Sequence, residues 1–313
     1  MTVCVAAISE NSGILAMADR MLTASIHQYQ PARAKIVPVT ASIIAMYAGD
    51  ANFAIELIEA VKAEVKAGID AKPTEWWGVQ ATAEVWQKVY LQRRRREAEL
   101  AYLAPFDLTT DSFLARQQQL SQSFVNKLTG ELAGYSLPDV EVIFAGLDSA
   151  GAHLYCADGA DVNCYTARGW AAIGIGAFHA RSEFINSRHL ASDSWLRVIY
   201  TTYVAKKRAE SAPGVGSETD SRIIWALGKS DQVRTEIMDT MQKAFADSEK
   251  KVAKQRSAVE AKVKVGIEAI TNPPQPPPEP TPAHQNAPIP PTPPAPTGNI
   301  PRPTPENRGP SVP

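Results

Sequence analysis

The sequence predicts an α+β protein in which helices cover the outer faces of two stacked antiparallel sheets. Two observations support this fold class. The first is a pair of short apolar runs, 3–8 and 14–18, around a polar turn at 10–13, a pattern typical of a β-hairpin. The second is the order of the elements, which come in groups of strands and groups of helices rather than in strict alternation. Together they predict layers in which helices lie outside stacked antiparallel sheets. Other features of the sequence predict a long C-terminal helix and a disordered proline-rich tail.

Composition limits the class of protein. The chain has 313 residues, 44% of them hydrophobic, which is enough for a sizeable core. Its 32 Lys and Arg nearly cancel its 33 Asp and Glu, so charge favours neither nucleic acid nor an acidic membrane as a partner. The first thirty residues contain no basic region followed by an apolar stretch, and no window holds 18 consecutive apolar residues. We therefore expect a soluble, cytoplasmic protein.

The cysteines predict no chemistry. Cys4, Cys156 and Cys164 are an odd number without a closely spaced pair, which argues against both a disulfide framework and a zinc site. We expect them to be buried, and we expect Cys156 and Cys164 to stay reduced even if they face each other across a hairpin. The sequence thus indicates neither a cofactor nor a metal.

After the hairpin, extended segments are predicted at 35–39 and 42–47. Gly49 and Asp50 then open a helix, with Asp50 in the N-cap position. The apolar positions of this helix are spaced for one buried face. They are Phe53, Leu57, Ile58, Val61 and Val65.

Residues 73–132 are helical in character and broken near Pro105. The four arginines at 93–96 could bind phosphate. A helix face exposed to solvent or to another subunit is favoured, because no Gly-rich phosphate loop accompanies the run.

The rest of the body is predicted to contain a group of short strands, then two helices and a final strand. Strands are predicted at 140–146, 153–156, 162–166, 171–173 and 222–227. A glycine turn at 174–176 precedes a helix that begins near Ala177. A second helix, 192–210, carries Trp195, Ile199 and Tyr203 on one side and stops before Pro213.

The C-terminal third differs from the body, which we place at 1–228. Residues 229–270 form an amphipathic helix whose later half has a narrow apolar stripe among many lysines, suited to a partner helix. Of the 24 prolines, 18 lie between Pro273 and Pro313, so the tail 271–313 is predicted to be disordered or polyproline II-like. A solvated tail is favoured over one that docks into an aromatic groove of a partner.

Thr2 is the residue with the clearest catalytic potential. Its small side chain permits aminopeptidase removal of Met1, and an N-terminal Thr supplies a hydroxyl nucleophile together with an α-amine base, whose unperturbed pKa is about 7.7–8.0. Taken alone, however, a Thr at position 2 is simply an acceptable second residue. The context is the order Thr2, then Asp19 at the end of the second strand, then Lys35, then Gly49 before a helix.

In this order and spacing, the chain resembles proteasome β-subunits and the bacterial protease HslV. The segment 169–177 is similar to the glycine turn of that family, and 211–220 resembles a loop of Anbu, a proteasome-like bacterial family. The resemblance covers residues 2–228 and implies the N-terminal-nucleophile (Ntn) hydrolase fold, a four-layer αββα sandwich of two antiparallel sheets. It also implies a homo-oligomer, as a ring or an open helical stack, that cleaves peptides or unfolded proteins; whether an ATPase partner feeds it is open.

The resemblance further implies a role for each site residue. Thr2 Oγ1 attacks a peptide carbonyl and forms an ester, which water then hydrolyses. Lys35 holds the proton network and keeps the α-amine neutral by like-charge repulsion, Asp19 orients Lys35, and the N–H of Gly49 stabilises the oxyanion.

Two positions depart from the family pattern. Ile175, next to Gly174, stands where the family usually has a serine near the amino group, and the loop after the fourth helix offers Glu210 or Ser211 where an aspartate is usual. Gly174, Glu210 and Ser211 are therefore possible supporting residues only. Two alternatives stay open: an Ntn amidohydrolase acting on a small amide, and a catalytically silent scaffold that recruits partners through its C-terminal helix and tail.

Overall fold

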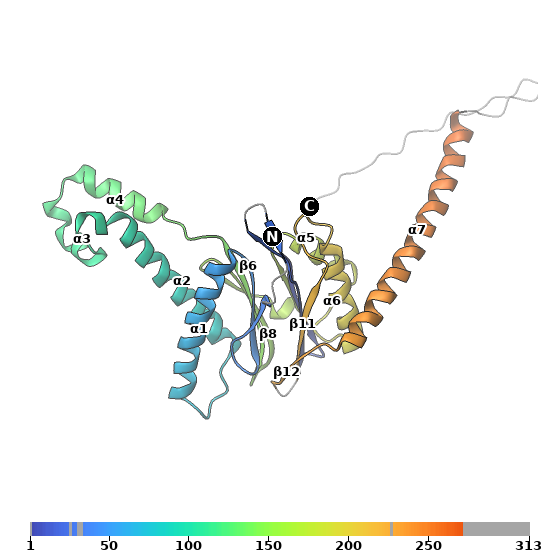
Figure 1. Cartoon of the computed structure of the whole chain (residues 1–313), viewed down its shortest axis with the longest axis horizontal. Coiled ribbons are helices and arrows are strands. Elements are labelled where there is room, and N and C mark those ends of the chain that lie inside the picture. Colours follow the sequence, from blue (N-terminus) through green and yellow to red (C-terminus); the bar gives the residue numbers. More distant parts are fainter. Residues whose placement is uncertain (1, 25–26, 30–33, 226–227, 272–313) are drawn as a thin grey trace, which may run out of the picture. The chain divides into compact units, whose positions relative to one another are not determined.

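A computed structural model describes residues 2–24, 27–29, 34–225 and 228–271 (Figure 1). Contacts divide the chain into two compact units, Met1–Ala253 and Lys254–Pro313. The predicted tail 271–313 lies outside the described residues except for Thr271, which ends a helix. All strands among the described residues, and the candidate site, belong to the first unit.

The first unit contains two five-stranded antiparallel sheets, so the predicted α+β class with two antiparallel sheets is confirmed. The first sheet has the order β10 (Trp170–Ile173), β1 (Cys4–Ser9), β2 (Gly13–Asp19), β11 (Thr219–Ile224) and β12 (Ser230–Gln232). The second has the order β5 (Ile36–Pro38), β6 (Ile43–Gly49), β7 (Val140–Asp148), β8 (Gly151–Asp158) and β9 (Asp161–Cys164). A small separate pair consists of β3 (Leu22–Ala24) and β4 (His27–Tyr29).

Helices flank the two sheets (Figure 1). Helices α1 (Ala51–Ala71) and α2 (Val79–Tyr102) pack on the second sheet, and α5 (Ala177–Asn186) and α6 (Trp195–Ala209) pack on the first. The chain also forms η1 (Ala104–Phe106), α3 (Thr110–Arg116), η2 (Gln117–Gln119), α4 (Gln122–Gly134) and η3 (Thr166–Arg168). Helix α7 (Thr235–Thr271) runs from the first unit into the second. Among the described residues, no helix has both the length and the apolar character needed to cross a membrane.

Strand β1 shows why the hairpin runs are apolar at every position. Successive side chains of a strand point to opposite faces, and here both faces are covered. One set packs between the two sheets, and the other packs against α5 and α6. The inner set is Cys4, Ala6 and Ile8, and the outer set is Val3, Val5 and Ala7. Strand β1 is therefore buried on both faces, and this burial fixes the position of the backbone that follows Thr2.

Helix α1 follows its prediction closely. The five apolar positions expected on one face are all buried, and Asp50 is the N-cap, its Oδ1 accepting a hydrogen bond of 2.9 Å from the Phe53 N–H. This cap fixes where β6 ends and α1 begins.

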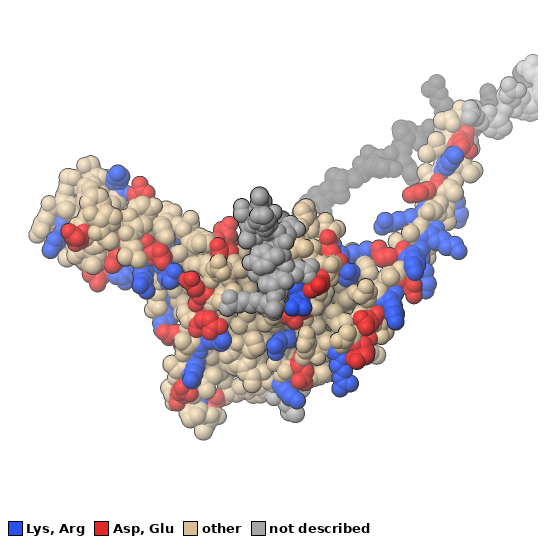
Figure 2. Space-filling model, viewed as in Figure 1, with Lys and Arg blue, Asp and Glu red and all other residues tan. Residues whose placement is uncertain are grey.

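The arginine run 93–96 lies on α2 and binds protein groups. Arg94 donates hydrogen bonds to the carbonyls of Leu132, Ala133 and Tyr135 at the end of α4. Arg93 pairs with Glu56 and Glu97, and Arg95 pairs with Asp111. These contacts agree with the favoured interpretation of the run as a helix face. On the face of the molecule in Figure 2, basic and acidic side chains lie next to one another.

The cysteine expectations were partly wrong. In the register of β8 and β9, Cys156 lies opposite Asn163 and Cys164 lies opposite Tyr155, so the two thiols are not directly paired. Cys4 is buried, but Cys164 is exposed, because β9 is the edge strand of its sheet. Burial raises the pKa of the Cys156 thiol to about 12.

Candidate active site

Antiparallel register gathers four chain segments at one edge of the first sheet. Cys4, at the start of β1, lies opposite Ala18 near the end of β2 and opposite Ile173 at the end of β10. Asp19 in turn lies opposite Thr219, the first residue of β11. The polypeptide just outside these strand ends therefore converges on one place. The segments that meet there contain Thr2, 19–21, 174–176 and 216–218.

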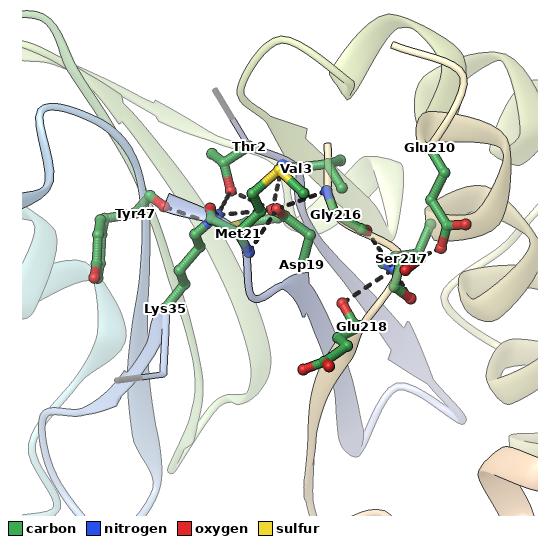
Figure 3. A network of polar contacts seen from close by, with 12 residues as sticks. Thr2, Val3, Asp19, Met21, Lys35, Tyr47, Glu210, Gly216, Ser217 and Glu218 are labelled. Carbon is green, nitrogen blue, oxygen red and sulfur yellow. Dashed lines mark hydrogen bonds and ion pairs between the residues drawn. The ribbon is translucent and has the colours of Figure 1, made fainter. Parts of the chain in front are cut away.

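Thr2, Asp19 and Lys35 form one buried hydrogen-bonded group (Figure 3). Lys35 Nζ donates to Thr2 Oγ1 and, at 2.9 Å, to Asp19 Oδ1, while Thr2 Oγ1 donates to the same carboxylate oxygen. The side chains of Lys35 and Asp19 are 2% and 0% exposed. Three of the predicted site residues, from two sheets, are thus brought into direct contact.

Backbone donors complete the shell of Asp19. The Val3 N–H donates to Oδ1 at 2.9 Å, and the N–H groups of Met21 and Gly216 each donate to Oδ2 at 3.1 Å. Lys35 also donates to the Met21 carbonyl. A buried carboxylate is tolerated when it is paired and hydrogen-bonded in this way. Both oxygens of Asp19 are consequently held in fixed positions beside Thr2.

The 174–176 turn holds the backbone of Thr2. The Gly176 N–H donates to the Thr2 carbonyl at 3.2 Å. Gly174 has a φ of +84°, and a Cβ on it would lie 2.4 Å from that same carbonyl oxygen, so glycine is required here. The Glu141 carboxylate fixes the turn from β7 by accepting the Gly174 N–H at 2.7 Å. Gly174 is therefore in contact with Thr2, whereas the neighbouring Ile175 is 52% exposed.

Gly49 is the last residue of β6. Its φ is +97°, and a Cβ on it would lie 2.2 Å from the Asp139 carbonyl oxygen, so the backbone conformation and this close approach both require glycine. Two residues earlier, the Tyr47 carbonyl accepts a hydrogen bond of 3.3 Å from Cys4 Sγ, which links β6 to the start of β1. The oxyanion role of the Gly49 N–H stays a prediction.

Glu210 and Ser211 form their hydrogen bonds away from Thr2. Glu210 accepts from Lys206 and Lys207, and the Ser211 hydroxyl donates to the Arg208 carbonyl at 2.8 Å. The contact from this region to the site comes instead from Gly216, through its N–H to Asp19. A backbone donor of this kind has no side-chain signature that the sequence could reveal.

Lys206 is a buried residue that the sequence reasoning missed. Its side chain is fully buried, and burial lowers the pKa of its ammonium group. A signal was available, because Lys206 follows Ile199 and Tyr203 at helical spacing and so lies on the apolar side of the predicted helix.

Asp220 is a further carboxylate near this edge, on β11 opposite Ala18. Its Oδ2 lacks a hydrogen-bond partner among the described residues. Burial raises the pKa of this carboxyl above its ordinary value of 3.8, although the Ser221 N–H, Arg222 and Arg20 act in the opposite direction.

We expect Asp220→Asn to raise the Tm at pH 7 by about 1–2 °C, as for a partly screened charge in a protein of this size. A carboxyl whose folded pKa is raised destabilises the fold progressively as the pH rises above its unfolded pKa, and the penalty is complete above the folded pKa. That penalty shrinks as the pH falls through the folded pKa towards 3.8 and is absent below it. Thermal scans between pH 4 and 8 measure the difference, with Asp161→Asn on the exposed edge strand as a charge-matched control. A variant less stable than the wild type at pH 7 would contradict the argument.

The arrangement at Thr2 is suited to nucleophilic chemistry. An ammonium group that donates to a hydroxyl oxygen stabilises negative charge developing there, and burial away from water strengthens this effect.

Burial raises the pKa of the nearby Cys4 thiol, which disfavours the reactive thiolate. The described residues include no group of three or more His, Cys, Asp or Glu that could hold a metal ion. A comparison with protein-family models gave no match, and a comparison with curated proteins gave none either.

Proposed function

We propose that this chain is an N-terminal threonine hydrolase of the Ntn type, which cleaves peptide bonds through Thr2 once Met1 has been removed. One observation carries the proposal: the Thr2 hydroxyl lies at a buried strand end in contact with the Lys35 ammonium and the Asp19 carboxylate. The two stacked sheets with flanking helices are the architecture that the family resemblance implies.

In the proposed mechanism, the α-amine of Thr2 takes the hydroxyl proton as Oγ1 attacks the substrate carbonyl. Lys35 stabilises the charge on Oγ1, and Asp19 keeps Lys35 in place. The Gly49 N–H receives the oxyanion of the tetrahedral intermediate. The α-ammonium then gives its proton to the leaving amine, which leaves an ester on Thr2. Water, deprotonated by the α-amine, hydrolyses that ester and restores the free hydroxyl.

We further propose that the enzyme works as a cytoplasmic homo-oligomer on peptides or unfolded proteins. The support is the presence of exposed apolar side chains on the helices that cover the first sheet, where Phe178 is 75% exposed and Leu196 is 84% exposed. Where such side chains form a contiguous patch, the surface is typical of one that packs against another protein.

The test is to treat the purified protein with a β-lactone and measure its intact mass. We expect a chain without Met1 that gains one acyl group, mapped by peptide fragmentation to Thr2. The Thr2→Ala protein is the control, because it keeps a small second residue but has no hydroxyl to acylate. A folded protein that retains Met1, or one without Met1 that gains no acyl group on Thr2, would overturn the proposal.

A catalytically silent scaffold is the second candidate. It is favoured by Ile175, whose apolar and half-exposed side chain has no donor or acceptor for the α-amine of Thr2. A Met1-free, folded and oligomeric protein that fails to react with the β-lactone would support this candidate.

A further inference from the structure

Lys206 lies behind the proposed site, on the side of α6. Its Nζ donates to Glu210 Oε1 at 2.6 Å and to three successive backbone carbonyls, those of Gly216 and Ser217 at 2.9 Å and Glu218 at 3.2 Å. Figure 3 shows the residues that supply these acceptors, Glu210, Gly216, Ser217 and Glu218, beside the group around Asp19. A buried ammonium is costly unless oxygen atoms surround it, so these acceptors are held close to Nζ.

Gly216 connects the two groups. Its carbonyl accepts from Lys206, and its N–H donates to Asp19 Oδ2 at 3.1 Å. The space around it is tight as well, since a Cβ at this position would lie 2.8 Å from the Met21 Cβ. The backbone of Gly216 is therefore fixed between a buried cation and the carboxylate that contacts Thr2.

We propose that Lys206 is a positioning residue, whose hydrogen bonds hold the 216–218 segment so that the Gly216 N–H donates to Asp19. Asp19 in turn keeps the Lys35 ammonium in contact with the Thr2 hydroxyl. Its catalytic consequence rests on the proposed function. If Lys206 only filled space in the protein core beside α6, an apolar side chain of similar length could replace it without loss of stability or reactivity. Lys206 instead acts through the charge that orders three carbonyls.

The chain offers a matched control in Lys207. Both lysines donate to Glu210, Lys206 to Oε1 and Lys207 to Oε2, but only Lys206 also donates to the 216–218 segment. Lys206→Met and Lys207→Met therefore each remove one ion pair with the same carboxylate. Only Lys206→Met also removes the hydrogen bonds to the 216–218 carbonyls.

The first measurement is hydrogen exchange of the full chain, followed in peptides that cover 214–219. In the wild type we expect protection of the Gly216 amide comparable to that in β2. Lys206→Met should increase exchange across the segment, while Lys207→Met should leave it at the wild-type rate. Fast exchange of Gly216 in the wild type, or unchanged exchange in a folded Lys206→Met protein, would overturn the proposal. If Lys206→Met does not fold, Lys206→Gln keeps a neutral donor and serves in its place.

The second measurement is the kinetics of acylation by the β-lactone. Lys206→Met should lower the maximal rate of inactivation on the order of 10- to 100-fold and leave the concentration for half-maximal rate unchanged, because positioning is lost and reagent binding is not. A maximal rate within about twofold of the Lys207→Met rate contradicts the catalytic part of the proposal. If the wild type does not react at all, the proposed function fails, while the exchange measurement still decides whether Lys206 holds the segment.

Discussion

On the proposed function, replacing Thr2 with Val is expected to lower kcat/KM for peptide hydrolysis by about 10⁴-fold or more, the size of loss expected when a catalytic nucleophile is removed. Val keeps the shape of Thr but has no hydroxyl. The rest of the site should persist, because Lys35 retains its hydrogen bonds to Asp19 and to the Met21 carbonyl. Initial rates on fluorogenic peptides measure the effect, and the thermal unfolding of each variant verifies that the fold is intact.

Thr2→Ser is the matched control for this prediction. It keeps the hydroxyl that contacts Lys35 and Asp19 and removes only the methyl group, so it should keep measurable turnover and react with the β-lactone. Hydrolysis by Thr2→Val at the wild-type rate would mean that a different group carries the reaction. Equal loss in Ser and Val variants would point to the packing of the methyl group instead.

The part of the site that the sequence predicted best depends on local structure. Thr2 and Asp19 belong to the same hairpin, and the length of its polar turn sets the register that places Asp19 beside the start of β1. Lys35 comes from the other sheet, so no local rule brings it to Thr2. Its assignment rested on family order, and the structure places it in contact with both residues.

The parts that were missed depend on tertiary structure. The aspartate that is usual in the family led to Glu210 and Ser211 as candidate supporting residues. In the structure, the contact with the site comes instead from the backbone N–H of Gly216. Because every residue except proline has a backbone N–H, the sequence gives no sign of which one makes this contact. Strand β12 has the polar sequence Ser-Asp-Gln, which lacks the alternation that marks a half-buried strand. Strand β11 begins earlier than the predicted 222–227 because it pairs with β2 from Asp19 to Ile14.

The second large effect concerns stability. Asp19→Asn is expected to lower the free energy of unfolding by about 3–5 kcal/mol, because it leaves the buried Lys35 charge without its counter-ion. The amide also introduces donors where only acceptors fit: Oδ1 accepts from Thr2, Val3 and Lys35, and Oδ2 accepts from Met21 and Gly216. In either orientation, the amide NH2 group would face at least two of these donors. Urea unfolding at fixed protein concentration measures the loss.

A double-mutant cycle separates the charge from the packing. Lys35→Met alone leaves the Asp19 carboxylate with its backbone donors but without its cation, so it should also destabilise the protein. The double variant removes both charges, and its loss should be smaller than the sum of the two single losses by about 1–3 kcal/mol, as for residues in direct contact. Simple additivity, or a loss below about 1 kcal/mol for Asp19→Asn, would contradict a buried ion pair. A stable but inactive double variant would show that the fold tolerates an apolar site and that the ion pair is maintained for its effect on Thr2.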